Sequence, residues 1–146
     1  EMINDELINN GVSVVTLLSE IAMLLEIQGS GNIGVITSVA GDRGRPSNYI
    51  YGSSKALVSS FCEGLRPRLH KKGICLTDIK PGFVDTPMTH HLDLPRMLLV
   101  SPEFVAKRII IALRKGKDVL YVPLFWRYIM FLIRLIPNTV YKKINL

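Results

Sequence analysis

Two short, mostly apolar segments lie between long helix-forming segments, and this alternation constrains the fold more than any other feature of the sequence. The apolar segments are rich in β-branched residues and do not alternate regularly with polar ones, which is typical of strands that are buried on both faces. The predicted strands are residues 32–38, 74–80 and 119–122, and the predicted helices are residues 5–27, 48–71 and 102–115. Strands that alternate with helices predict βαβ units, and therefore an α/β fold with a doubly wound parallel sheet and flanking helices.

The predicted helices have start and stop signals in the sequence. Ser47 is the expected N-cap of the second helix, and Gly73 is expected to end it. Ser101 is the expected N-cap of the third helix, because Pro102 suits the first helical position. Residues 83–100 show no regular pattern, and we expect them to be irregular.

Residues 123–146 form a hydrophobic and basic helical tail that follows a folded domain over residues 1–122. Within residues 121–136, only Arg127 and Arg134 interrupt the apolar run. The run is shorter than the ~20 residues that span a bilayer, and an arginine near its centre is costly there. The two arginines share one helix face, so a helix that lies in the membrane interface is one interpretation. The alternative is a C-terminal helix packed at a subunit interface or against the core.

The charge is unevenly distributed, which bears on the binding partners. Residues 1–30 contain five acidic and no basic residues, whereas the rest of the chain contains all 18 basic residues and the other seven acids. The basic part contains no basic run with interleaved aromatic residues, so we expect no binding to nucleic acid and consider a membrane surface instead. The two cysteines and the absence of a secretory signal indicate a cytoplasmic protein, with the inner face of the membrane as a further location.

Tyr51 and Lys55 form a Tyr-x-x-x-Lys pattern near the start of the second predicted helix. A spacing of four places both side chains on one helix face. A free tyrosine has a pKa of about 10, and a nearby ammonium lowers that pKa because it favours the phenolate. The pair therefore predicts a general acid–base group. Taken alone, the pattern also fits a surface lysine beside a half-buried tyrosine.

Ser38 ends the first predicted strand and precedes Tyr51 by a loop long enough to bring the two together. Open α/β sheets bind their ligands beyond the carboxyl ends of the strands. A hydroxyl at this position can hold a substrate carbonyl oxygen while the tyrosine gives or takes the proton. The alternative is a hydroxyl that only closes a turn at the end of the strand.

Three motifs in this order resemble the short-chain dehydrogenase/reductase family. They are Gly-Val-Ile-Thr-Ser-Val-Ala-Gly at residues 34–41, Tyr-x-x-x-Lys at residues 51–55, and Pro-Gly-Phe-Val-Asp-Thr at residues 81–86. The resemblance extends over nearly the whole chain. It implies a Rossmann-type sheet and an NAD(P)-dependent oxidoreductase that transfers a hydride between nicotinamide and a carbonyl or alcohol carbon.

The resemblance also implies roles for individual residues. Ser38, Tyr51 and Lys55 correspond to the catalytic serine, tyrosine and lysine of the family. Tyr51 would be the general acid in reduction, Lys55 would lower its pKa and hold the nicotinamide ribose, and Ser38 would orient the carbonyl. The family asparagine that supports a proton relay corresponds to Asn10, with Asn9 as the alternative. The residues expected to contact the cofactor are Tyr51, Lys55, Pro81, Gly82, Val84 and Thr86.

The glycine-rich cofactor motif of the family, Thr-Gly-x-x-x-Gly-x-Gly, does not occur in the sequence. We therefore expect the chain to be the C-terminal catalytic portion of a larger domain, and to bind NADPH or NAD weakly or not at all by itself. NADPH is favoured over NAD as the cofactor, and the full-length protein is expected to be a homo-oligomer. The alternative function is a non-enzymatic membrane-surface or scaffold protein derived from such a reductase.

Residues 40–49 and 80–88 resemble a bacterial branch of the family, similar to reductases of polyprenyl-phosphate-linked 2-keto sugars. This resemblance implies a small-molecule or lipid-linked carbonyl substrate. We expect residues 87–100 to cover the substrate pocket. No metal site is expected, since His90 and His91 have no further metal ligands near them in the sequence and fit a solvated loop or a substrate contact better.

Overall fold

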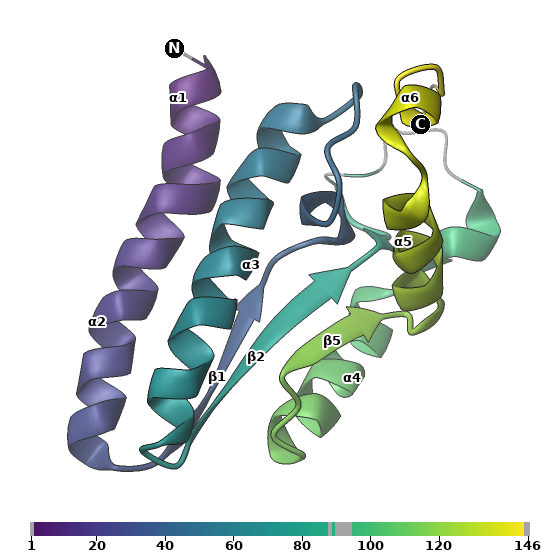
Figure 1. The fold of residues 1–146 in the computed structure, drawn as a ribbon. Coiled ribbons are helices and arrows are strands. Elements are labelled where there is room, and N and C mark those ends of the chain that lie inside the picture. Colours follow the sequence, from purple (N-terminus) through teal and green to yellow (C-terminus); the bar gives the residue numbers. More distant parts are fainter. Residues whose placement is uncertain (1, 88, 90–94, 145–146) are drawn as a thin grey trace.

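A computed structural model describes residues 2–87, 89 and 95–144 (Figure 1). Its centre is a parallel three-stranded sheet with the order β1-β2-β5, formed by Gly31–Ile36, Ile74–Pro81 and Val119–Val122. Helices lie on both faces of the sheet: α2 and α3 run side by side on one face, and α4 lies behind β5 on the other (Figure 1). The predicted α/β fold with a parallel sheet and flanking helices is confirmed.

The helices match the predicted segments closely. The first is one long helix made of α1, a π-helical turn η1 and α2. The helical elements are α1 (Met2–Leu7), η1 (Ile8–Val12), α2 (Ser13–Gln28), α3 (Tyr49–His70), α4 (Pro102–Arg114), α5 (Phe125–Leu135) and α6 (Asn138–Tyr141), with 3-10 turns η2 (Val39–Gly41) and η3 (Arg96–Leu98). The π-helical turn was not predicted, because an extra residue in one turn barely alters the apolar periodicity.

Two of the predicted helix boundaries are confirmed and one is wrong. The Ser101 hydroxyl accepts a hydrogen bond from the amide of Phe104 at the start of α4, and Gly73 adopts a left-handed backbone with φ +72° after α3. Ser47 is not the N-cap of α3, because the helix begins one residue later and Asn48 takes that position. The amide of Asn48 donates to the carbonyl of Arg45, and this turn leaves Asn48 at the helix entrance.

The segment 83–100 is more regular than predicted. β3 (Phe83–Val84) and β4 (Leu99–Val100) pair in parallel, and the amide of Asp85 extends this pairing to the carbonyl of Val100. Pairing over two residues leaves no detectable period in a sequence, which explains the error.

The core is divided between the two faces of the sheet. On one face, α2 and α3 pack on β1 and β2, and on the other α4 packs on β2 and β5. Trp126 and Met130 of α5 form a third buried cluster with Val39, just beyond β1. The predicted tail thus packs on the end of the sheet, while the predicted boundary between residues 122 and 123 stays a prediction.

The helix Met2–Gln28 is the one described helix that is long and apolar enough to cross a membrane. Its Leu18 and Ala22 are buried in the core shared with α3 and the sheet. Only 17% of the apolar window of this helix is buried, so one side of it packs on the core and the other side is exposed.

Candidate active site

Ser38 lies just beyond β1, where the chain turns into η2. Its backbone is extended, and its hydroxyl accepts a hydrogen bond from the amide of Ala40 at 3.1 Å. This contact is the turn-closing bond expected of a hydroxyl at a strand end. It also fixes the side chain at the carboxyl edge of the parallel sheet, where α/β proteins place their ligands.

Two glycines bring the turn after Ser38 directly against α3. A Cβ on Gly52 would lie 2.8 Å from the carbonyl oxygen of Ala40, and one on Gly41 would lie 2.8 Å from the amide nitrogen of Ala56. Neither position leaves space for a side chain, so backbone packs on backbone. This close approach is what brings the Ser38 hydroxyl to the first turn of α3, where Tyr51 is found.

Ser38 lies beside Tyr51, close enough for its side chain to influence the pKa of the tyrosine. Burial raises the pKa of Tyr51 above its usual value, and the interaction with the Ser38 side chain opposes that shift. The sequence-based expectation that Lys55 brings the pKa of Tyr51 down is not met in the described structure. The Lys55 ammonium is 5.5 Å from the centroid of the Tyr51 ring, and burial outweighs the other effects.

Lys55 is buried, and its burial lowers the pKa of the ammonium. Among the described residues, no hydrogen bond or ion pair to this ammonium is found. The ammonium nitrogen is not among the fully buried unpaired side-chain atoms of the described residues, so it stays accessible to an external acceptor beside the Tyr51 ring.

Asn10 lies in the π-helical turn, one turn away from the acid Glu6. Its amide donates a hydrogen bond to the Glu6 carboxylate at 2.9 Å. The turn packs against α3, since a Cβ on Gly11 would lie 3.0 Å from Leu57 and 3.5 Å from Ser54. Asn10 is half-buried, whereas Asn9 is exposed, so the burial favours Asn10 over Asn9 as the residue next to the site.

Glu6 is a site residue that the sequence reasoning missed. Its charge raises the pKa of Tyr51 and also raises the pKa of Lys55, so the carboxylate acts on both members of the pair. Glu6 and Tyr51 also line the same cavity, of about 330 Å³. The available signal was the four-residue spacing from Asn10, which places the two side chains on one helix face.

Pro81 is the last residue of β2, and Gly82 follows it at the same edge of the sheet. The amide of Gly82 donates to the carbonyl of Val122, and a Cβ on Gly82 would lie 1.8 Å from the indole nitrogen of Trp126. No side chain other than hydrogen fits there, so Trp126 sets the path of this segment. The indole N–H is buried and has no hydrogen-bond partner among the described residues.

The turn from Val84 to Thr86 is braced by Thr89, a residue that the sequence reasoning did not single out. The Thr89 hydroxyl donates to the carbonyl of Val84 at 2.6 Å and accepts from the amide of Thr86 at 3.2 Å. Val84 and Thr86 are both partly exposed. The turn therefore stays ordered while it presents Thr86 at the surface.

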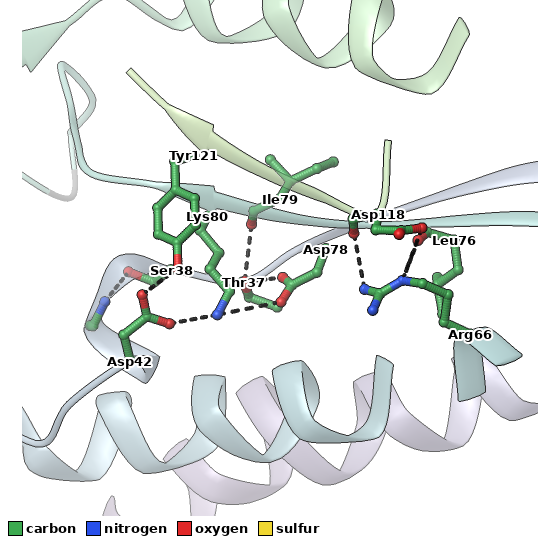
Figure 2. A network of polar contacts seen from close by, with 11 residues as sticks. Thr37, Ser38, Asp42, Arg66, Leu76, Asp78, Ile79, Lys80, Asp118 and Tyr121 are labelled. Carbon is green, nitrogen blue, oxygen red and sulfur yellow. Dashed lines mark hydrogen bonds and ion pairs between the residues drawn. The ribbon is translucent and has the colours of Figure 1, made fainter. Parts of the chain in front are cut away.

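A buried ionic network lies beneath the site, between the sheet and α3 (Figure 2). The Lys80 ammonium lies 2.5 Å from a carboxylate oxygen of Asp42 and 3.6 Å from one of Asp78. The Tyr121 hydroxyl donates to Asp42 at 2.8 Å, and the Thr37 hydroxyl donates to Asp78 at 2.5 Å. The network ties the turn after Ser38 to β2 and β5.

The described residues contain no group of three or more His, Cys, Asp or Glu side chains that could hold a metal ion. His90 and His91, which we expected to lie in a loop or contact substrate, are outside the described residues, as is much of the predicted pocket cover at 87–100.

The family model for short chain dehydrogenases matches residues 1–96. The chain therefore belongs to the short-chain dehydrogenase family. The matched range contains Ser38, Tyr51, Lys55 and residues 81–86, and it is the N-terminal part of this chain. The resemblance expected over nearly the whole chain is thus found by the family model only up to residue 96.

Curated relatives extend the similarity further. The chain is 39% identical over 132 residues to an uncharacterized oxidoreductase of Mycobacterium tuberculosis, covering 90% of this chain and 53% of that protein. It is 35% identical over 120 residues to an uncharacterized oxidoreductase of Streptomyces coelicolor, covering 82% of this chain and 47% of that protein. The chain thus spans about half the length of the curated relatives it matches.

Solved structures share the fold at lower sequence identity. A short-chain dehydrogenase from Burkholderia cenocepacia in complex with NADP aligns with a TM-score of 0.82 at 19% identity, covering 97% of this chain and 58% of that one. A short-chain dehydrogenase from Sphingobium yanoikuyae in complex with NADPH aligns with a TM-score of 0.70 at 22% identity, covering 88% and 55%. These likenesses support the Rossmann-type arrangement of the sheet and helices.

Proposed function

We propose that the chain is the catalytic portion of an NAD(P)-dependent reductase that interconverts a carbonyl compound and an alcohol. The observation that carries the proposal is the cluster of Ser38, Tyr51 and Lys55, in which the Ser38 hydroxyl and the Lys55 side chain lie beside Tyr51, and the Lys55 ammonium makes no hydrogen bond or ion pair to a described residue.

The residues at this site fit a nicotinamide dinucleotide. The unpaired Lys55 ammonium and the Tyr51 hydroxyl are donors suited to the hydroxyls of a ribose. Pro81, Gly82, Val84 and Thr86 would lie along the nicotinamide end of the same molecule. NADP is the favoured form, because the two structural neighbours described above are in complex with NADP and NADPH. When bound, the cofactor supplies or takes the hydride.

The protein residues would then handle the carbonyl oxygen and its proton. Ser38 would donate a hydrogen bond to that oxygen, and Tyr51 would deliver the proton that neutralises it. Lys55 would hold its positive charge next to Tyr51, which favours proton release when the reaction partners are in place. Asn10, at the π-helical turn, would connect this group to solvent.

The proposal predicts that the full-length protein binds NADPH and consumes it with a carbonyl substrate. We expect saturable binding in a fluorescence titration, and loss of absorbance at the nicotinamide band with some members of a panel of aldehydes and ketones. The isolated chain of residues 1–146 is the comparison, and we expect it to bind NADPH much more weakly. If the full-length protein binds neither NADPH nor NADH, the scaffold alternative is favoured instead.

A second prediction concerns Glu6 and the pH dependence of the reaction. Because the Glu6 carboxylate raises the pKa of Tyr51, Glu6→Gln should lower that pKa. Reduction needs the protonated tyrosine, so its rate falls as pH rises through the pKa of Tyr51, and the variant should lose activity at lower pH than the wild type. Ser38 and Lys55 also contact or flank Tyr51 and are unchanged in this comparison.

The measurement is kcat/KM as a function of pH for both proteins. Asp5→Asn is the matched control, since Asp5 is an exposed acid on the same helix. An unshifted alkaline limb in Glu6→Gln, with the control also unshifted, would show that Glu6 does not act on the catalytic pair.

For the substrate we propose only a chemical class. A small-molecule or lipid-linked carbonyl compound agrees with the resemblance of residues 40–49 and 80–88 to reductases of lipid-linked keto sugars. The cytoplasmic location, the homo-oligomer and the absence of nucleic-acid binding likewise stay predictions.

A further inference from the structure

The side of α5 that faces away from the core is apolar. Trp126 and Met130 are buried beneath the helix, at 4% and 1% exposure. On the opposite side, large apolar side chains recur at spacings of four and three along the helix and just before it. They are Leu124, Tyr128, Phe131 and Leu135, exposed to 52%, 63%, 60% and 63%, flanked by Phe125 at 36% and Leu132 at 63%.

A helix that is apolar on both sides is normally covered on both sides. Contiguous exposed apolar surface of this kind marks a contact with a protein or a membrane. This surface, which we call the α5 face, consists of the six exposed residues named above. The charge of α5 and of the residues that follow it indicates which kind of partner covers this face.

The charges on α5 and on the residues that follow it are all positive, whereas the α3 wall of the adjoining groove carries both Glu63 and Arg66. Residues 119–146 contain Arg127, Arg134, Lys142 and Lys143 and no acidic residue. Arg127 and Arg134 are both exposed and lie seven residues apart, so they flank the α5 face along one side. If a second copy docked through the same face, two sets of like charges would meet across a two-fold axis, which disfavours that contact.

The neighbouring surface does not offer a matching wall for a protein helix either. Leu124, Tyr128 and Phe131 form one side of an open groove of about 1490 Å³. The facing side, on α3, is lined by Ser59, Ser60 and Glu63, together with Ala56 and Arg66. A mostly polar wall opposite an apolar one does not complement an apolar helix.

The helix is too short to cross a bilayer. Its 11 residues span about 16 Å at 1.5 Å per residue, against a hydrocarbon core of about 30 Å. A helix of this length with arginines beside an apolar face is typical of one that lies in the plane of the interface, where long basic side chains reach the headgroups.

Contacts within the protein fix the orientation of α5 in the absence of a membrane. The Arg43 guanidinium donates to the carbonyls of Ile133 and Arg134 at the end of α5, at 2.5 and 3.1 Å, and it stacks on the Tyr141 ring at 3.8 Å. The Tyr141 hydroxyl donates in turn to the carbonyl of Gly44. A pre-ordered helix loses little conformational freedom on binding, which favours its use as a docking surface.

We propose that the α5 face binds the surface of an anionic lipid bilayer. Arg43 and Gly44 lie in the loop that follows Ser38 and η2, so docking through α5 would hold the Ser38–Tyr51 edge of the sheet near the bilayer. This binding is independent of the proposed enzymatic activity, since it uses none of the residues assigned to the reaction.

The test is co-sedimentation of the full-length protein with vesicles of phosphatidylcholine that contain about one third phosphatidylglycerol. We expect binding to these vesicles and much weaker binding to pure phosphatidylcholine. The variant Phe131→Ser/Leu135→Ser should bind at least about tenfold more weakly, since it removes two exposed apolar side chains from the contact. Arg127→Gln/Arg134→Gln should lose the preference for anionic vesicles.

The matched control is Leu24→Ser/Ile27→Ser, which removes two apolar side chains from α2 that are even more exposed, at 66% and 85%. It should bind like the wild type. Circular dichroism checks that each variant is folded, and substitutions at exposed positions are expected to leave folding intact. Equal binding of the Phe131/Leu135 variant and the wild type would overturn the proposal. The proposal would also be overturned if the wild type did not bind anionic vesicles. It would likewise be overturned if the wild type formed a dimer that the Phe131→Ser/Leu135→Ser variant converts to a monomer.

Discussion

Replacing Tyr51 by phenylalanine in the full-length protein is expected to lower kcat for carbonyl reduction by about 10²–10⁴-fold, the range for removing a general acid. The substitution removes one hydroxyl from a ring that is otherwise kept, so the fold should change little. The interaction of the hydroxyl with Ser38 is lost, which should cost at most about 1.5 kcal/mol of stability. NADPH binding should weaken less than turnover, because Lys55 stays in place.

The measurement compares kcat and the urea midpoint of the variant with those of the wild type. Tyr49→Phe is the control, because Tyr49 lies on the same helical turn but is 60% exposed. Its kcat should be close to that of the wild type. Turnover in Tyr51→Phe within a factor of a few of the wild type would refute the role of Tyr51 as the proton donor.

Replacing Lys80 by methionine should destabilise the protein by about 3–5 kcal/mol, the cost of breaking a buried ion pair by removing one partner. Lys80 is 9% exposed and lies between the carboxylates of Asp42 and Asp78. Without the ammonium, two carboxylates remain close together in the interior, held only by the hydroxyls of Thr37 and Tyr121. Methionine keeps much of the volume, so the loss reflects charge more than packing.

Urea unfolding of the wild type and the variant checks this prediction. Lys115→Met removes an exposed lysine after α4 and should change the unfolding free energy by less than about 0.5 kcal/mol. The double variant Lys80→Met/Asp42→Asn should recover part of the loss, because it removes one of the two uncompensated charges while it keeps an acceptor for Tyr121. A loss below about 1 kcal/mol in Lys80→Met would mean that the network contributes little to stability.

The layered fold could be predicted because it follows from local signals that agree with one another. Gly73 and Ser101 mark helix boundaries by their own backbone chemistry, and residues 74–80 are too rich in apolar and β-branched side chains for an exposed segment. The β3–β4 pairing could not be predicted, since the two short strands are separated by a dozen or so residues and leave no period. The π-helical turn could not be predicted for a similar reason: it alters a single turn of a long helix and hardly changes the apolar pattern.

Part of the candidate site could likewise be predicted from the sequence, and part could not. Ser38, Tyr51 and Lys55 carry a spacing and an order that the sequence displays, and the structure brings them together. The influence of Glu6 depends on how α1 packs on α3, which is a tertiary contact without a local signature. The pKa of Tyr51 shows the limit of reasoning from sequence spacing. The four-residue spacing predicted that Lys55 lowers this pKa, whereas burial, which a spacing does not reveal, raises it.

Trp126 is the only tryptophan of the chain, and its indole is packed against Gly82 with 4% exposure. An indole in a dry environment emits at shorter wavelength than one in water, so this residue provides the chain with its own fluorescent label. Occupation of the Pro81–Gly82 segment by a reduced nicotinamide would quench that emission by energy transfer. Docking of α5 on vesicles would instead leave the intensity high and shift the emission little, because the indole is already dry. Quenching of this emission would therefore report binding of the nicotinamide and not docking of α5, without any added dye.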